Sequence, residues 1–139
     1  MNSMINNPEV GKSIQCGDIV TNYHDVGTGE PILLLHGSGP GVSAWANLRL
    51  TIQALQDQYR LIAPDLAGFG YSQFPENMQF SRENWLKQII DFLDAIGLEQ
   101  VNVIGNSFGG SMALALAIHH PERVNKLVLM GSVGVPFEL

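Results

Sequence analysis

Residues 101–118 read VNVIGNSFGGSMALALAI, and this stretch decides how the rest of the chain is interpreted. The mostly apolar residues 101–104 are typical of a strand, and the Ala- and Leu-rich end of the stretch is a strong helix former. Between them, Gly-Asn-Ser-Phe-Gly matches the Gly-x-Ser-x-Gly pattern of a nucleophile elbow, a sharp strand-to-helix turn that presents a serine hydroxyl. Gly105 and Gly109 permit the close approach of backbones that this turn requires. The stretch therefore predicts Ser107 as a catalytic nucleophile.

The same stretch has two simpler interpretations: a Gly-rich turn without chemistry, or a phosphate-binding turn. A dinucleotide-binding loop would need Gly-x-Gly-x-x-Gly, and this segment lacks it. The flanking strand and helix favour the nucleophile. A helix N-terminus at this point would direct the backbone amide of Phe108 toward the oxyanion that forms when Ser107 attacks a carbonyl.

A second Gly-rich loop, HGSGPG at residues 36–41, follows the apolar run ILLL at residues 32–35. A loop at the end of such a buried strand is placed to supply the other N–H group of an oxyanion hole. Its glycines let the backbone fold over a pocket, and Pro40 restricts one φ angle. The alternative is an ordinary turn. We predict that the backbone amide of Ser38, and not its hydroxyl, joins that of Phe108 as an oxyanion donor.

The remaining pattern alternates strands with helices and contains no repeat, low-complexity tract or linker. Expected strands cover residues 13–16, 19–26, 32–35, 60–63, 101–104 and 126–130, the first two forming an antiparallel pair. Expected helices cover residues 45–55, 81–97 with Ser81 as N-cap, and 107–118, while residues 27–31, 36–41 and 65–80 are expected to form loops. This alternation predicts an α/β fold with a doubly wound, mostly parallel sheet.

Nothing resembling a cap, linker or terminal helix follows the expected last strand. We therefore interpret residues 1–139 as the N-terminal part of a core domain, truncated after about the sixth strand, with a lid and the C-terminal core strands absent.

The composition excludes several classes of protein. The apolar content of 45% suits a packed core, whereas the 14% of charged residues is low for a disordered chain. A net charge of −6 is unlike the basic footprint that neutralises phosphates, so we expect no nucleic-acid partner. The longest apolar stretch, residues 112–118, is far shorter than the roughly 20 residues of a membrane span. No secretory signal is visible, so we expect a cytoplasmic protein without a membrane partner.

Three stretches together resemble a known family. They are residues 33–47 (LLLHGSGPGVSAWAN), the segment from 62 to 70 (IAPDLAGFG), and residues 105–110 (GNSFGG). They look like the meta-cleavage product hydrolases of the α/β-hydrolase superfamily, and in particular the 2-hydroxymuconate-semialdehyde hydrolases of bacterial aromatic degradation. The elbow marks only the superfamily, whereas the Gly-Ser-Gly-Pro-Gly loop followed by Trp and Asn is more specific.

The resemblance implies hydrolysis of a C–C bond in a 2-hydroxy-6-oxo-dienoate, a small-molecule substrate, without a metal or organic cofactor. The dienol is first ketonised, and water and the serine machinery then cleave the bond next to the 6-oxo carbon. By this likeness, the amides of Ser38 and Phe108 hold the 6-oxo oxygen. Asn47 and Asn106 face the dienoate end, and Gly37 and Gly39 also belong to the substrate-binding residues.

In this superfamily an Asp or Glu and then a His follow the serine along the chain, and no strand pair after residue 130 carries them. We interpret His36 as structural and His24 as facing solvent, and expect His119 and His120 to end a helix, where cations favour the macrodipole. Asp65 is interpreted as a turn-stabilising carboxylate in preference to a catalytic one.

Trp45 and Trp85 are interpreted as packing residues, with Trp45 at the pocket border, and Cys16 as an inert free thiol. The sequence thus predicts a serine-type hydrolase, but two alternatives stay open. One is a carboxylesterase on the same fold, and another is a catalytically incompetent fragment that acts only in binding. A dehalogenase or epoxide hydrolase is disfavoured because serine, not aspartate, occupies the elbow. Whether the complete enzyme is a homo-oligomer also stays open.

Overall fold

The structure of the chain is a computed structural model, which describes residues 6–132. Its elements are β1 (Lys12–Cys16), β2 (Ile19–Val26), β3 (Glu30–Leu35), α1 (Ala44–Leu55), β4 (Tyr59–Pro64), α2 (Arg82–Ala95), β5 (Val101–Asn106), α3 (Phe108–His119), the 3-10 turn η2 (Pro121–Arg123) and β6 (Val124–Met130). Every expected strand and helix is present, and no end moves by more than two residues. The fourth strand extends one residue beyond its expected end, so that Pro64 is its last residue.

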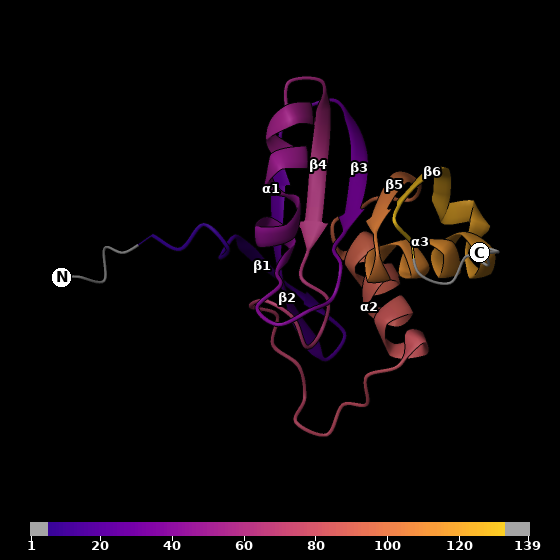
Figure 1. Cartoon of the computed structure of the whole chain (residues 1–139). Coiled ribbons are helices and arrows are strands. Elements are labelled where there is room, and N and C mark those ends of the chain that lie inside the picture. Colours follow the sequence, from indigo (N-terminus) through magenta and orange to yellow (C-terminus); the bar gives the residue numbers. More distant parts are fainter. Residues whose placement is uncertain (1–5, 133–139) are drawn as a thin grey trace, which may run out of the picture.

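All six strands form one sheet in the order β1-β2-β4-β3-β5-β6. The β1–β2 and β2–β4 pairs are antiparallel, whereas β3 pairs in parallel with β4 and β5, and β5 with β6. Figure 1 shows β3, β4 and β5 running in the same direction through the middle of the molecule. The predicted mostly parallel sheet is therefore confirmed.

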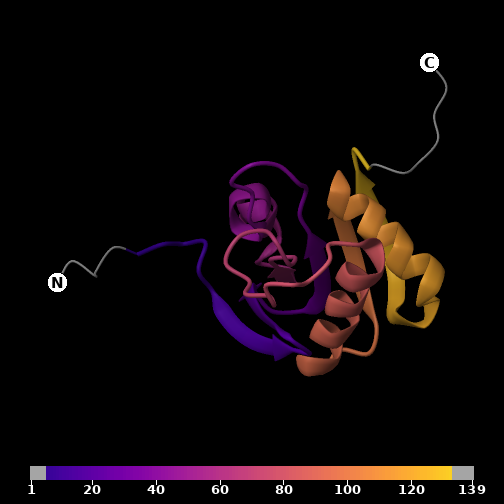
Figure 2. The ribbon, with the colours of Figure 1, turned by 90° about the horizontal axis from the view of Figure 1, so that it is seen from below.

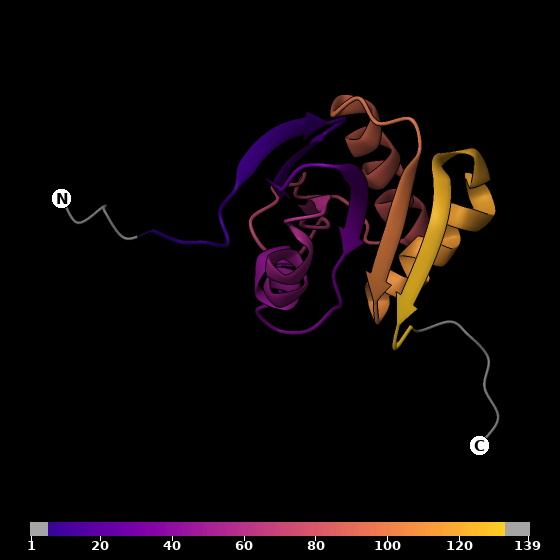
Figure 3. The same ribbon diagram turned by 90° about the horizontal axis from the view of Figure 1, so that it is seen from above.

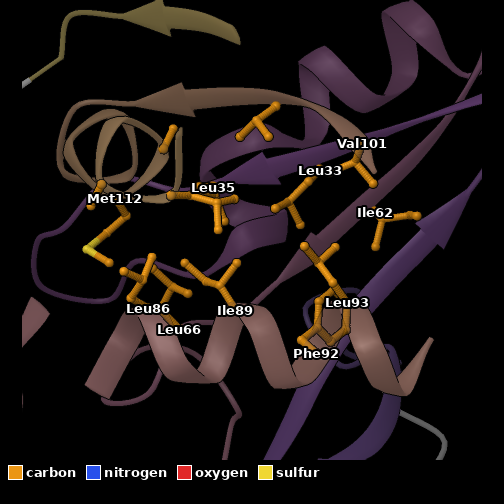
Figure 4. Close-up of a cluster of buried hydrophobic side chains, with 14 of the residues drawn as sticks. Leu33, Leu35, Ile62, Leu66, Leu86, Ile89, Phe92, Leu93, Val101 and Met112 are labelled. Carbon is orange, nitrogen blue, oxygen red and sulfur yellow. The ribbon is translucent and has the colours of Figure 1, made fainter. Parts of the chain in front are cut away.

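Helices cover both faces of the sheet, α1 on one side and α2 with α3 on the other (Figure 2). The central strand β3 explains this arrangement because its side chains alternate between the faces. Leu33 and Leu35 pack in the cluster with α2 and α3, and Ile32 and Leu34 pack in the cluster with α1. Figure 4 shows the side chains of α2 directed at the two leucines of the first cluster.

The carboxyl ends of β3, β4 and β5 lie at one edge of the sheet because these strands are parallel. The loops after β3 and β4 and the turn into α3 therefore meet at this edge, which is where open α/β sheets carry their sites (Figure 1).

The last strand is less well covered than the centre of the sheet. Among residues 6–132 no strand pairs with the outer edge of β6, and no helix lies over its α1-side face (Figure 3). Val128 on this strand is 51% exposed. An open, apolar strand edge is a surface that favours pairing with another strand.

Candidate active site

Ser107 has a backbone conformation that residues with a side chain rarely adopt. Its φ of 53° and ψ of −116° make it the one non-glycine residue with positive φ in the described part of the chain. It joins the end of β5 to the start of α3. Its amide donates to the carbonyl of Met130 (2.9 Å), and its carbonyl accepts from the amide of Gly110 (2.8 Å). These bonds hold the strained turn that the Gly-x-Ser-x-Gly pattern predicted.

Close packing around the turn explains its glycines. A Cβ atom on Gly105 would lie 2.7 Å from the Cα of Gly110, and one on Gly109 would lie 2.5 Å from the carbonyl oxygen of His36 and closer still to that of Leu35. All these contacts are with backbone, which cannot swing away. The elbow is therefore held by packing that leaves no room for a methyl group at either position.

The amides of Phe108 and Gly109 begin α3 and have no carbonyl partner within the described residues. Such unsatisfied N–H groups carry the positive end of the helix dipole. The Ser107 side chain makes no capping hydrogen bond to the helix and is half-buried beside them. This arrangement is suited to holding an anion next to a hydroxyl.

The Gly-rich loop after β3 lies against the elbow. A Cβ atom on Gly37 would be 3.5 Å from the Cβ of Ser107, which is ordinary van der Waals contact. Ser38 and Gly39 are exposed, and Gly39 has a φ of 144°. In the described part of the chain the amide of Ser38 makes no hydrogen bond, so its N–H is available to donate one to a ligand.

Asn47 connects this loop to the elbow. Its Oδ1 atom accepts from the amide of Gly37 (2.9 Å) and from the Nδ2 of Asn106 (3.1 Å). The structure thus brings together three of the residues predicted to bind substrate. The two hydrogens on Nδ2 of Asn47 have no partner among the described residues, so they are available to a ligand.

Asp65 is fully buried directly after β4 and accepts three hydrogen bonds. Its Oδ1 accepts from the amide of Ala44 (2.7 Å), and its Oδ2 accepts from the Nδ2 of Asn22 (2.9 Å) and the amide of Tyr71 (2.8 Å). The interpretation of Asp65 as a turn-stabilising carboxylate agrees with these contacts. The sequence did not predict that it also binds the start of α1.

His36 is structural, as expected. It is fully buried, and its Nε2 accepts from the amide of Leu66 (2.9 Å), which places the proton on Nδ1, 2.6 Å from the carbonyl oxygen of Gly37. Burial lowers the pKa of His36, and the Gly37 hydrogen bond and the charge of Asp65 oppose this only in part. Both ring nitrogens are occupied, so this ring is not free to take a proton from Ser107.

The expectation that His24 faces solvent is wrong. Its side chain is buried, its Nε2 lies 2.7 Å from the carbonyl oxygen of Pro8, and its ring stacks on Trp45 at 5.0 Å. The strand pattern did not reveal this because a segment that precedes β1 folds over the ring. His119 and His120 do end α3, as expected. A helix of 12 residues is about 18 Å long, which separates them from the elbow.

The other singled-out side chains are packing residues. Trp85 donates from its indole N–H to the carbonyl of Ala67 (2.9 Å) and contacts Phe108 edge-on at 4.9 Å. Trp45 is half-buried against His24. Cys16 is buried, and burial raises the pKa of its thiol, which disfavours the reactive thiolate.

The sequence analysis did not identify two buried polar side chains beside Asp65, those of Ser72 and Gln88. Ser72 donates to the carbonyl of Asp65 (2.7 Å), and Gln88 donates to the same carbonyl (3.1 Å) and accepts from the amide of Ala67 (2.8 Å). A polar Asn22 in the middle of a β-rich stretch was the available signal for such a group. Within residues 6–132, no helix has the length and apolar content needed to cross a bilayer, and no cluster of metal-ligating side chains occurs.

Comparison with known proteins agrees with this geometry. The family model described as "alpha/beta hydrolase fold" matches residues 30–139. The chain therefore belongs to the α/β hydrolase fold family.

Particular relatives are more informative about the chemistry. The chain is 53% identical over all 139 residues to the 2-hydroxymuconate semialdehyde hydrolase of Pseudomonas sp. strain CF600, covering 49% of that protein. It is 51% identical over 133 residues to the 2-hydroxy-6-oxo-2,4-heptadienoate hydrolase of Pseudomonas putida F1, covering 96% of the chain and 48% of that protein. A crystal structure of the meta-cleavage product hydrolase from Pseudomonas fluorescens IP01, an alanine-for-serine mutant with acetates, superposes with a TM-score of 0.91 at 52% identity, over 95% of this chain and 48% of that one. The chain spans about half the length of these relatives.

Proposed function

We propose that this chain carries the nucleophile and the oxyanion hole of a meta-cleavage product hydrolase. The reaction is hydrolysis of a C–C bond in a 2-hydroxy-6-oxo-dienoate formed when an aromatic ring is opened. The observation that carries the proposal is the strained Ser107, with its φ of 53°, next to the Gly37 loop and the free amides that begin α3. Relatives that share half of their length with this chain are named for this class of substrate.

Each proposed role is assigned from the position of the residue in the site. Ser107 is the nucleophile, and the amides of Ser38 and Phe108 stabilise the oxyanion that develops on the 6-oxo oxygen. The side chains of Asn47 and Asn106, beside Gly37 and Gly39, receive the dienoate end. After ketonisation of the dienol, addition of water across the bond next to the 6-oxo carbon releases a carboxylic acid and a 2-hydroxypentadienoate.

The proton acceptor for Ser107 must come from elsewhere. His36 is engaged at both nitrogens and His24 lies under the N-terminal segment, so no histidine in residues 6–132 is free beside the hydroxyl. We propose that an Asp and a His from a complementary half complete the triad, in the chain order Ser, Asp, His that is usual in this superfamily. The 139-residue chain alone is then expected to give no turnover.

A chimera tests the proposal. Residues 1–132 are joined to the unmatched half of the 53%-identical relative, and the purified protein is assayed on yellow ring-fission products with 6-H, 6-alkyl and 6-aryl groups. We expect turnover in the chimera, none in the chain alone, and none in the chimera with Ser107→Ala. Hydrolysis of simple esters but of no dienoate would instead support the carboxylesterase. Turnover by the chain alone that depends on Ser107 would contradict the need for a second half.

We further propose a cytoplasmic location and no nucleic-acid partner. The single cysteine is buried and unpaired, which suits a reducing compartment, and the net charge of −6 disfavours phosphate backbones.

A further inference from the structure

Helix α1 connects a buried carboxylate to the Gly-rich loop at residues 36–41, which is called the oxyanion loop below after its proposed role. Its first residue, Ala44, donates its amide to Oδ1 of Asp65 at 2.7 Å. Its fourth residue, Asn47, accepts the amide of Gly37 at 2.9 Å. One helical turn therefore separates a contact with the core from a contact with the loop beside Ser107.

The anchor at Asp65 is unusually well defined. The side chain is fully buried, and none of the ion pairs formed within residues 6–132 involves it. Its negative charge is instead held by the N–H groups of Ala44 and Tyr71 and the side-chain amide of Asn22. One of these belongs to the N-terminus of α1, where a carboxylate is favoured by the helix dipole. The side chain of Ser43, the N-cap, also accepts a hydrogen bond from the amide of Ala46 at 3.1 Å.

The far end of the connection is Asn47. Its single oxygen accepts both the loop amide of Gly37 and the side-chain amide of Asn106, the residue before Ser107. A shift of the first turn of α1 therefore moves the loop and the elbow relative to each other. Displacements of about 1 Å at a catalytic site are sufficient to reduce turnover a hundredfold.

We infer that Asp65 is a positioning residue, which sets the oxyanion loop against Ser107 through the first turn of α1 and Asn47. The inference rests on the proposed function, because the loop has a catalytic role only in such a hydrolase. Asp65 does not itself meet the substrate, since its side chain is fully buried.

The substitution Asp65→Asn tests this role selectively. An asparagine offers one oxygen where the site presents donors to two. The orientation that keeps two of the three hydrogen bonds leaves the asparagine oxygen with Asn22 and Tyr71. The NH2 group of the asparagine then faces the amide of Ala44, donor against donor, and the anchor of α1 is lost. The matched control is Ser72→Ala, which removes hydrogen bonds to the carbonyl of Asp65 and from the amide of Asn22 but leaves the contact with α1 intact.

The first measurement needs no activity. Hydrogen exchange of the Gly37 amide is followed in the 139-residue chain by mass spectrometry at micromolar concentration. We expect Asp65→Asn and Asn47→Ala each to accelerate this exchange about tenfold, the effect of losing one hydrogen bond, while Ser72→Ala leaves it within about twofold. Asn47 is exposed, so Asn47→Ala preserves the fold even if Asp65→Asn does not.

The second measurement is a double-mutant cycle on kcat in the chimera. We expect each of Asp65→Asn and Asn47→Ala to lower kcat about tenfold to a hundredfold, and the double variant to lose no more than the worse single variant. Ser72→Ala should reduce the melting temperature while kcat stays unchanged.

Two results would overturn the inference: Gly37 exchange in Asp65→Asn no faster than in Ser72→Ala, or fully multiplicative losses of kcat in the double variant. If the chimera hydrolyses no dienoate, the proposed function fails, while the exchange data on the chain still decide whether Asp65 positions the loop.

Discussion

The two halves of the candidate site are held in different ways. The elbow is fixed by packing: a Cβ atom on Gly105 or Gly109 would meet backbone atoms closer than 3.0 Å, so a methyl group has no place at either position. The oxyanion loop and α1 are fixed by polar contacts to Asn47, Asp65 and His36. A Cβ atom on Gly39 or Gly41 in the loop would have no other atom within 4 Å. The elbow should therefore respond to added volume, and the loop to lost hydrogen bonds and to pH.

The largest effect is expected at the hydroxyl itself. In the chimera, Ser107→Ala should lower kcat by several orders of magnitude while substrate binding persists, because the packed elbow keeps its shape without the hydroxyl. Stopped-flow binding and steady-state assays measure the two quantities separately. Near wild-type turnover in this variant would remove Ser107 from its proposed role.

Added volume separates the two regions most clearly. Gly109→Val should destabilise the chain by about 3 kcal/mol or more, because its side chain meets the backbone of Leu35 and His36. Gly37→Ala is the matched control, since its Cβ fits at 3.5 Å from that of Ser107 and should leave the denaturation midpoint near that of the wild type. Equal midpoints for the two variants would show that the elbow is not held by packing.

The polar region should depend on pH through His36. This histidine folds in its neutral form with a lowered pKa, chiefly because of burial, whereas its ordinary value is 6.5. Its contribution to stability is thus fully present above pH 6.5 and is lost as pH falls below that value toward the folded pKa. We expect a slope of up to about 1.4 kcal/mol per pH unit in the free energy of unfolding.

Denaturant titrations between about pH 7.5 and pH 5.5 measure this slope. The control is His36→Gln, which carries no titrating ring and should flatten the dependence, leaving the share of the carboxylates. An unchanged slope in the variant would assign the acid sensitivity to groups outside the loop.

The smallest effect is expected where the N-terminal segment meets α1. The hydroxyl of Ser43 donates to Oε1 of Glu9 at 2.6 Å. Glu9→Ala should destabilise the chain by about 1 kcal/mol through loss of this partly buried bond, whereas Glu9→Gln, which keeps an acceptor, should have a smaller effect. Indistinguishable midpoints for wild type and Glu9→Ala would show that the segment does not support the helix.

The elbow was predictable from sequence because its requirements are local. A strand, a helix and glycines at fixed offsets around Ser107 are all visible within residues 101–118, and the neighbouring loop was recognised in the same way. The structural role of His36 was also correctly predicted. The elbow and the loop depend on residues that are close together in the chain, whereas the partner of His36, the amide of Leu66, lies 30 positions away and was not predicted.

The polar contacts were not predictable because they join distant residues. His24 was placed at the surface, but residues near Pro8 cover it. Asp65 was expected to stabilise a turn, yet its partners include Asn22 and Ala44, which lie 43 and 21 positions away. Nothing in the periodicity of a strand indicates which remote segment will fold over its side chains.

If Ser107 has its proposed role as the nucleophile, its left-handed backbone sets stability against activity at a single position. Glycine adopts a φ of 53° without the steric cost that serine carries, so Ser107→Gly should relieve about 1 kcal/mol of strain while abolishing the hydroxyl. A library selected only for resistance to heat would accumulate glycine at this site and become inactive. Under the proposed function the serine is retained only by selection for its chemistry, and its replacement in a thermostable homologue would be a direct sign that the chemistry had been lost.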